Sequence, residues 1–214
     1  MKHFVFCHGF AFDRSFWNNL SDYFSQEHCT YLDLGYFDDP AEFYVETPCS
    51  QLIGIGHSLG LLKLLTLKKS FDHLIGLNAF TNFLGGTPAL RKQRVTELEQ
   101  LKKQFIQSPI RTLKRFYHRC GVAVDPPTVE KIDLPSILRD LDALKENGAI
   151  PTSSKALIIG ARDDIIVPPA ILQDNFKNAL NTRVEIVEQG QHGLGFFKDQ
   201  WVSEKIMSFI NDSE

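Results

Sequence analysis

The sequence has no long hydrophobic run. No segment approaches the ~18–20 consecutive apolar residues that a membrane-spanning helix needs. The first ten residues, MKHFVFCHGF, contain an apolar run too short for a secretory signal, and no small-residue cleavage pattern follows it. We therefore expect no membrane association and no export, and predict that the protein is cytoplasmic.

Cysteine is also scarce, and its spacing excludes two classes of site. The four cysteines are far apart, with no C-x-x-C pair and no clustering of metal-ligating residues. This pattern predicts reduced thiols and no metal centre. The chain also has no large excess of positive or negative charge, since its net charge is −3. With no recognition motif present, binding to nucleic acid is disfavoured.

The composition that is present is typical of a soluble globular domain. Hydrophobic residues make up 43% and charged residues 23% of 214 residues, and 17 phenylalanines can fill a large core. Apolar runs alternate with patterns of helical period, the first at 14–24 and the last at 199–212. Each predicted strand is part of one of the stretches 3–10, 29–35, 50–58, 72–80, 154–164 and 182–192, which also contain turn or loop residues next to the strand. This alternation predicts an α/β fold, a mostly parallel sheet of about six strands with helices on both faces.

One stretch breaks the alternation. Residues 85–149 contain three helical patterns and no convincing strand. We interpret this stretch as a helical lid inserted into a core formed by residues 1–84 and 150–214. No internal repeat or low-complexity segment is present.

The segment Gly56-His57-Ser58-Leu59-Gly60 lies between a predicted strand and a predicted helix. A G-x-S-x-G pattern alone is weak, but strand–turn–helix is the context of a nucleophile elbow. The two glycines allow the neighbouring segments to approach without Cβ clashes. The helix amino terminus adds free N–H groups that stabilise an anion near Ser58. We predict that Ser58 is a nucleophile.

A serine nucleophile needs a base, and the base needs an acid to orient it. Of the seven histidines, only His192 lies in a short loop after the last predicted strand. Asp163 and Asp164 follow the preceding predicted strand; we favour Asp163 as the acid and keep Asp164 as the alternative. The chain order Ser58, Asp163, His192 is that of the α/β-hydrolase triad.

Two backbone N–H groups complete the predicted site. His8-Gly9 ends the first predicted strand, so the N–H of Phe10 and that of Leu59 could face Ser58 as an oxyanion hole. Acyl transfer by such a site requires neither a metal nor an organic cofactor, and we predict none.

These motifs make the chain resemble the α/β-hydrolase superfamily from CHGF to the terminal helix, without the usual initial hairpin of two strands. Within it, the chain is most similar to the pimeloyl-[acyl-carrier protein] methyl ester esterases of biotin synthesis. The similarity is carried by HGFAFDRSFW, GHSLGLL, LNAFTNF, LKRFYHRCG and LRDLDALKENGA. It implies hydrolysis of the methyl ester of a pimeloyl chain held on acyl carrier protein. The alternatives are a general short-chain carboxylesterase or thioesterase, and a non-catalytic binding protein with the same fold.

The charge of the predicted lid bears on this substrate. Between Arg91 and Arg119, nine basic and two acidic residues give +7, so the rest of the chain carries −10. A basic lid suits a small acidic carrier protein, although a solvated helix face is the plainer interpretation. We predict that Arg111, Arg115 and Arg119 contact the carrier or its phosphopantetheine, that Phe116 lines the pocket, and that the protein is a monomer.

Overall fold

A computed structural model describes residues 2–40, 49–67 and 70–212. Its centre is a six-stranded sheet of order β2-β1-β3-β4-β5-β6, in which every neighbouring pair is parallel. The prediction of a parallel sheet of about six strands is confirmed. The strands are β1 (Lys2–Cys7), β2 (His28–Leu32), β3 (Gln51–His57), β4 (His73–Leu77), β5 (Lys155–Ala161) and β6 (Thr182–Val187).

The central strands are mostly apolar because both faces of the sheet are covered. Side chains alternate between faces along a strand. In β1, Phe4 and Phe6 belong to one hydrophobic cluster, whereas Val5 and Cys7 belong to another. All four side chains are fully buried. The unbroken apolar runs in the sequence therefore reflect burial on two sides.

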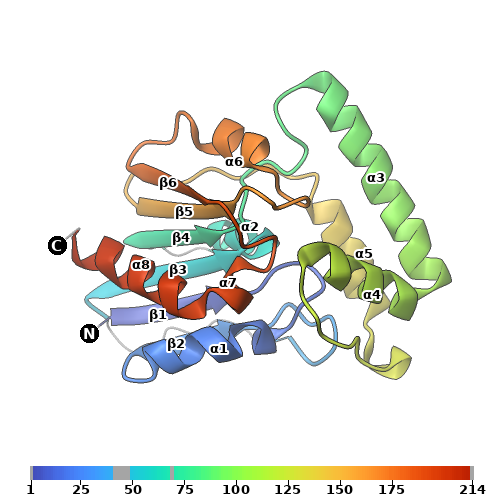
Figure 1. Ribbon diagram of the computed structural model, residues 1–214, viewed down its shortest axis with the longest axis horizontal. Coiled ribbons are helices and arrows are strands. Elements are labelled where there is room, and N and C mark those ends of the chain that lie inside the picture. The colour runs from blue at the N-terminus through green and yellow to red at the C-terminus, as the bar shows by residue number, and fades with distance from the viewer. Residues whose placement is uncertain (1, 41–48, 68–69, 213–214) are drawn as a thin grey trace.

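Helices cover both faces (Figure 1). Helices α1, α2 and α8 all contribute side chains to the cluster around Phe4 and Phe6. In Figure 1, α1 and α8 lie in front of the sheet and α2 lies behind it. The elements that contribute side chains to this cluster include η1 (Arg14–Trp17), α1 (Asn18–Ser21), η2 (Asp22–Phe24), α7 (Leu194–Phe197) and α8 (Asp199–Asn211). The cluster around Val5 and Cys7 is completed by α2 (Leu59–Thr66) and α6 (Pro169–Phe176). The helical pattern predicted at 14–24 is thus three short consecutive helical pieces.

The stretch between β4 and β5 contains α3 (Pro88–Gln107), α4 (Pro109–Cys120), η3 (Val129–Lys131) and α5 (Leu134–Ala143). Figure 1 shows α3, α4 and α5 together beyond one end of the sheet. Thr87 caps α3 by accepting the N–H of Leu90, and α4 ends at Gly121 with φ of 78°. The three helical patterns in the sequence correspond to these three α-helices.

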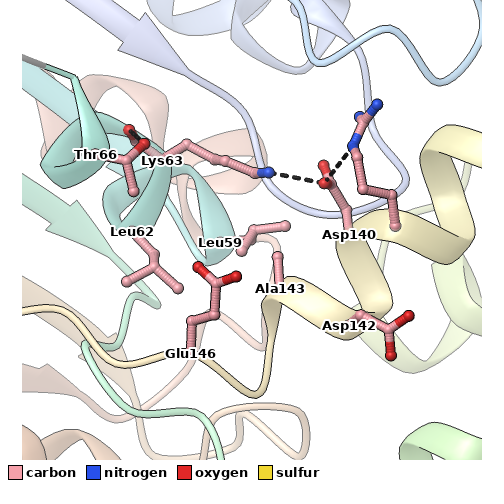
Figure 2. Close-up of a pocket in the computed structure, with 9 residues that line it drawn as sticks. Leu59, Leu62, Lys63, Thr66, Asp140, Asp142, Ala143 and Glu146 are labelled. Atoms are coloured by element: carbon pink, nitrogen blue, oxygen red, sulfur yellow. Dashed lines mark hydrogen bonds and ion pairs between the residues drawn. The ribbon is translucent and has the colours of Figure 1, made fainter.

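A buried carboxylate joins α5 to the core (Figure 2). Asp140, which is fully buried, accepts hydrogen bonds from Lys63 Nζ of α2 at 2.7 Å and from Arg139 Nε at 3.1 Å. Its other oxygen accepts from the hydroxyl of Tyr36 at 2.7 Å. Asp140 and Lys63 line a cavity of about 470 Å³ between α2 and α5, whose lining includes neither Ser58 nor His192. Because Lys63 and Tyr36 come from distant parts of the chain, Asp140 fixes the position of α5.

In the described part of the chain, no helix has the length and apolar character needed to cross a membrane.

Candidate active site

Ser58 occupies a sharp turn between β3 and α2. Its backbone has φ of 52° and ψ of −120°, a conformation that costs a non-glycine residue about 1–3 kcal/mol. The Ser58 N–H donates to the carbonyl of Leu77 at 2.9 Å, which anchors the turn to β4. A Cβ added at Gly60 would overlap the carbonyl oxygen of Cys7, so only glycine lets α2 start this close to β1. The turn is therefore a nucleophile elbow in its geometry.

Three side chains form a continuous hydrogen-bonded chain at this turn. His192 Nε2 lies 3.0 Å from Ser58 Oγ, and His192 Nδ1 lies 2.8 Å from Asp164 Oδ2. Their exposed fractions are 5% for Ser58, 1% for His192 and 2% for Asp164. With Nδ1–H donating to the carboxylate, Nε2 is left to accept the serine proton. This is the arrangement of a nucleophile, a base and an orienting acid.

The carboxylate that contacts His192 is that of Asp164, the alternative residue, so the preference for Asp163 is corrected. Asp163 Oδ1 instead accepts the N–H groups of Gly190 at 3.0 Å and Gln191 at 2.8 Å, at an exposed position. The turn after β5, closed by the Asp164 N–H to the Ala161 carbonyl, directs the second carboxylate inward. Asp163 holds the loop that carries His192, while Asp164 touches His192 itself.

Asp164 is held as a carboxylate by its neighbours. Burial raises the pKa of this carboxyl, but the His192 ring and the N–H groups of Val167 and Ile166 lower it further, so that it lies below its ordinary value. Asn78 Nδ2 also donates to Oδ2 at 2.8 Å. Each carboxylate oxygen thus has two donors, and the charge that orients His192 is secured.

The two residues predicted to supply an oxyanion hole, Phe10 and Leu59, belong to segments close to Ser58. Gly9 packs so closely that an added Cβ would be 3.1 Å from Ser58 Cβ, which brings the following residue, Phe10, to the elbow. Leu59 is the first residue of α2, where N–H groups have no intrahelical partner. Within the described residues, neither the Phe10 N–H nor the Leu59 N–H has an acceptor. Both donors are available to an anion at Ser58.

A cavity of about 530 Å³ opens on Ser58. Its wall is formed by Phe10 and by residues of α3 and α4, with Leu144 and the loop after β5 completing it. Phe116 lines the cavity, as the sequence predicts. The wall combines apolar residues such as Phe10 and Leu98 with polar residues of α3, so it can hold an acyl chain with its carbonyl at Ser58.

The predicted basic contacts divide into two groups. Arg115 and Arg119 line the cavity and are exposed, whereas Arg111 is exposed on the same side of α4 and lies outside the cavity wall. The spacing of four residues places all three on one helix face. None of them forms an ion pair within the described residues.

One cavity residue was not singled out from the sequence. Arg94 lines the cavity and is only 8% exposed. Its position could have been recognised, because Leu90 precedes it by four residues and Leu98 follows it by four. The three therefore share one face of α3, and a single basic residue on an apolar face is a signal of function.

Comparisons with known proteins agree with this architecture. No protein-family model and no curated protein matches the sequence. Solved structures do match. An esterase from Exiguobacterium antarcticum superposes with a TM-score of 0.78 at 17% identity, covering 99% of this chain and 92% of that one. An epoxide hydrolase from Bacillus megaterium gives 0.72 at 18% identity, covering 99% and 94%. MenH from S. aureus gives 0.70 at 14% identity, with the same coverage.

The strand order, the helical insertion and these neighbours define the class: the chain has the α/β-hydrolase fold. At these identities the likeness extends to the fold, and the chemistry must be argued from the residues at the elbow.

Proposed function

We propose that the protein is a serine hydrolase that cleaves carboxylic esters. The observation that carries the proposal is the hydrogen-bonded chain from Ser58 through His192 to Asp164 at a strained elbow. A strained, buried serine held against an imidazole nitrogen has little structural purpose, because the strain costs conformational free energy. Nucleophilic catalysis gives it one.

In the acylation step, Ser58 Oγ attacks the ester carbonyl carbon as its proton passes to His192 Nε2. The resulting oxyanion accepts hydrogen bonds from the N–H groups of Phe10 and Leu59, each worth about 3–4 kcal/mol in such sites. The C–O bond to the alcohol then breaks, and the alcohol takes the proton from His192. Asp164 keeps the imidazolium oriented throughout.

In the deacylation step, water gives a proton to His192 Nε2 and bonds to the acyl carbon. The second oxyanion occupies the same pair of N–H groups. Its collapse breaks the bond between carbon and Ser58 Oγ, and the proton on His192 returns to Ser58. The products are an alcohol and a carboxylic acid, and every group needed comes from the chain.

For the substrate, we propose the methyl ester of a pimeloyl chain carried on acyl carrier protein, in the cytoplasm, as the family resemblance implies. The support from the structure is the exposed basic surface of α4, where Arg115 and Arg119 line the Ser58 cavity and Arg111 and Lys114 are exposed on the same helix. An acidic carrier docked there would deliver its acyl arm to the elbow. The second candidate is a free short-chain ester or a thioester, which the same cavity accommodates.

The first test compares wild type with Ser58→Ala on three esters: the carrier-bound pimeloyl methyl ester, dimethyl pimelate and p-nitrophenyl butyrate. We expect a much higher kcat/KM on the carrier ester, and no activity on any ester in the variant. Comparable values on all three would favour the general esterase. Activity that survives in Ser58→Ala would refute the serine mechanism.

The second test addresses the basic face. Replacing Arg111, Lys114, Arg115 and Arg119 by glutamine should lower the ratio of kcat/KM for the carrier ester to that for p-nitrophenyl butyrate. The matched control replaces Lys102 and Lys103 of α3, which are basic but lie outside the cavity wall. An unchanged ratio in the α4 variant would exclude docking on this face.

A further inference from the structure

Arg94 is a buried cation without a carboxylate partner. Arg94 is only 8% exposed. Among the described residues, no Asp or Glu oxygen lies within ion-pair distance of its guanidinium. Burying a charge without a partner is costly, and buried arginines are normally paired. The residue is retained inside the wall of the Ser58 cavity, where a ligand can supply the missing charge.

The local contacts of Arg94 use only a small part of its bonding capacity. A guanidinium carries five N–H donors in a planar fork. One nitrogen, Nη1, donates to the carbonyl of Ile166 at 3.0 Å, and the group lies 4.5 Å from the centroid of the Phe83 ring. These contacts fix its position beside the loop that carries Asp164. The donors that remain have no acceptor within the described residues and border the cavity.

The charges around Arg94 favour an anion. Arg115 and Arg119 line the same cavity, and Glu97 is the only carboxylate in its described lining. Glu97 is exposed and accepts a hydrogen bond from Gln93 Nε2 at 2.8 Å. Burial lowers the pKa of Arg94, and Glu97 and Asp164 oppose this effect, so the guanidinium stays charged. The cavity thus has a cationic wall that the catalytic chain does not use.

We propose that Arg94, together with Arg119 at the exposed edge of the cavity, binds a second, non-reacting anionic group of the substrate while Ser58 attacks the ester. The inference rests on the proposed ester hydrolysis and narrows its substrate class to esters of anionic acyl compounds. Two groups have this chemistry: the free carboxylate of a dicarboxylic half-ester, and the phosphate of a phosphopantetheine arm. A planar fork suits both, since it can donate two parallel hydrogen bonds to either.

The experiment uses two substrate pairs that differ only in the anion. The first pair is monomethyl against dimethyl pimelate, with the glutarate and adipate homologues to vary the reach. The second is methyl pimeloyl-phosphopantetheine against methyl pimeloyl-pantetheine. The variants are Arg94→Gln, Arg94→Lys and, as the matched control, Arg91→Gln, which alters an exposed residue of the same helix outside the cavity wall.

We expect wild type to have a higher kcat/KM for the anionic member of one substrate pair. A preference within the first pair identifies the anion as a carboxylate, and a preference within the second identifies it as a phosphate. In Arg94→Gln, the ratio of kcat/KM for the anionic to the neutral ester should fall about 10- to 100-fold, the effect of losing a charge-assisted hydrogen bond. Arg94→Lys, which keeps the charge and loses the fork, should lie between that variant and wild type. Arg91→Gln should keep the wild-type ratio.

Equal ratios in wild type and Arg94→Gln for both pairs would overturn the proposal, and so would an equal fall in Arg91→Gln. If Arg94 had a purely structural role, its replacement would lower kcat/KM for both members of a pair equally and leave the ratio unchanged. Calorimetric titration of pimelate and of phosphopantetheine into wild type and the Arg94 variants gives the same comparison without turnover. Failure of the proposed hydrolysis would appear separately, as activity independent of Ser58.

Discussion

His57 Nε2 donates a hydrogen bond of 2.8 Å to the backbone carbonyl of His192. The residue next to the proposed nucleophile, Ser58, therefore holds the backbone of the proposed base, His192. His57 is fully buried and stacks on Phe16, with ring centroids 4.2 Å apart. Burial is the main reason that the pKa of His57 lies well below its ordinary value, and the nearby His192 ring lowers it further. His57 is accordingly neutral, with its proton on Nε2.

This burial predicts a pH-dependent stability. The folded-state pKa of His57 is depressed, while the unfolded chain takes up a proton near pH 6.5. The contribution of neutral His57 to the free energy of unfolding is therefore complete above pH 6.5. It is lost as the pH falls towards the folded-state pKa, because the unfolded chain binds the proton first. His57→Gln keeps a donor and does not titrate. Between pH 6.5 and 5, the free energy of unfolding of wild type should fall up to about 1.4 kcal/mol per pH unit more steeply than that of the variant. Urea unfolding at several pH values measures this; parallel curves would contradict it.

The two neighbouring aspartates should differ sharply in mutants. Asp164→Asn removes the carboxylate that orients His192, and kcat on p-nitrophenyl butyrate should fall about 10³- to 10⁴-fold, as in other triads. Asp163→Asn keeps an oxygen that can accept the N–H groups of Gly190 and Gln191, so its activity should remain close to wild type. The reverse ranking would show that the turn after β5 presents the other carboxylate during catalysis.

Gly9 controls the space around the nucleophile. An added Cβ would be 2.5 Å from His57 Nδ1 and 3.1 Å from Ser58 Cβ. Gly9→Ala should therefore displace Ser58 and the Phe10 N–H, and lower kcat about 100-fold or more, the effect of losing one oxyanion donor. Gly195→Ala is the control, because its Cβ would meet a movable methyl, Leu77 Cδ1, at 3.1 Å. It should stay active, and equal losses in both variants would argue against a specific role for Gly9.

Two acidic residues of α5 allow a test of how the insertion is held. Asp140→Ala leaves Lys63 and Tyr36 without their buried partner and should lower the free energy of unfolding by about 3–5 kcal/mol. Asp142 also forms ion pairs, with Lys102 and Lys145, but its side chain is 52% exposed. Asp142→Ala should cost less than about 1 kcal/mol. Denaturant unfolding of both variants gives the comparison, and similar losses would mean that Asp140 does not anchor α5.

The fold could be predicted from the sequence because its signals are repeated along the chain. Six apolar runs with intervening helical patterns admit few arrangements besides a covered parallel sheet. Ser58 was recognisable because the elbow needs strand, glycine and helix within a few residues, all visible in the local sequence. His192 followed from its place after the last strand, where parallel strands present their carboxyl ends together.

Other features depend on geometry that the sequence does not display. Whether Asp163 or Asp164 faces His192 is decided by one residue in a turn, and adjacent side chains point in opposite directions there. Arg94 was hidden among nine basic residues whose exposure differs, although its spacing from Leu90 and Leu98 carried the information. Two partners of Asp140, Lys63 and Tyr36, lie 77 and 104 positions away along the chain, a distance at which no local pattern applies.

The spacing of the proposed catalytic residues along the chain affects the order in which the site is assembled during folding. Ser58 and His192 are 134 positions apart, and His192 follows the edge strand β6, which joins the sheet only through β5. Non-local parallel pairing of this kind forms slowly. A chain that has built β1 to β4 already possesses its elbow, yet lacks both the base and the acid. Recovery of the proposed esterase activity after dilution from denaturant would thus report the pairing of β6 with the rest of the sheet.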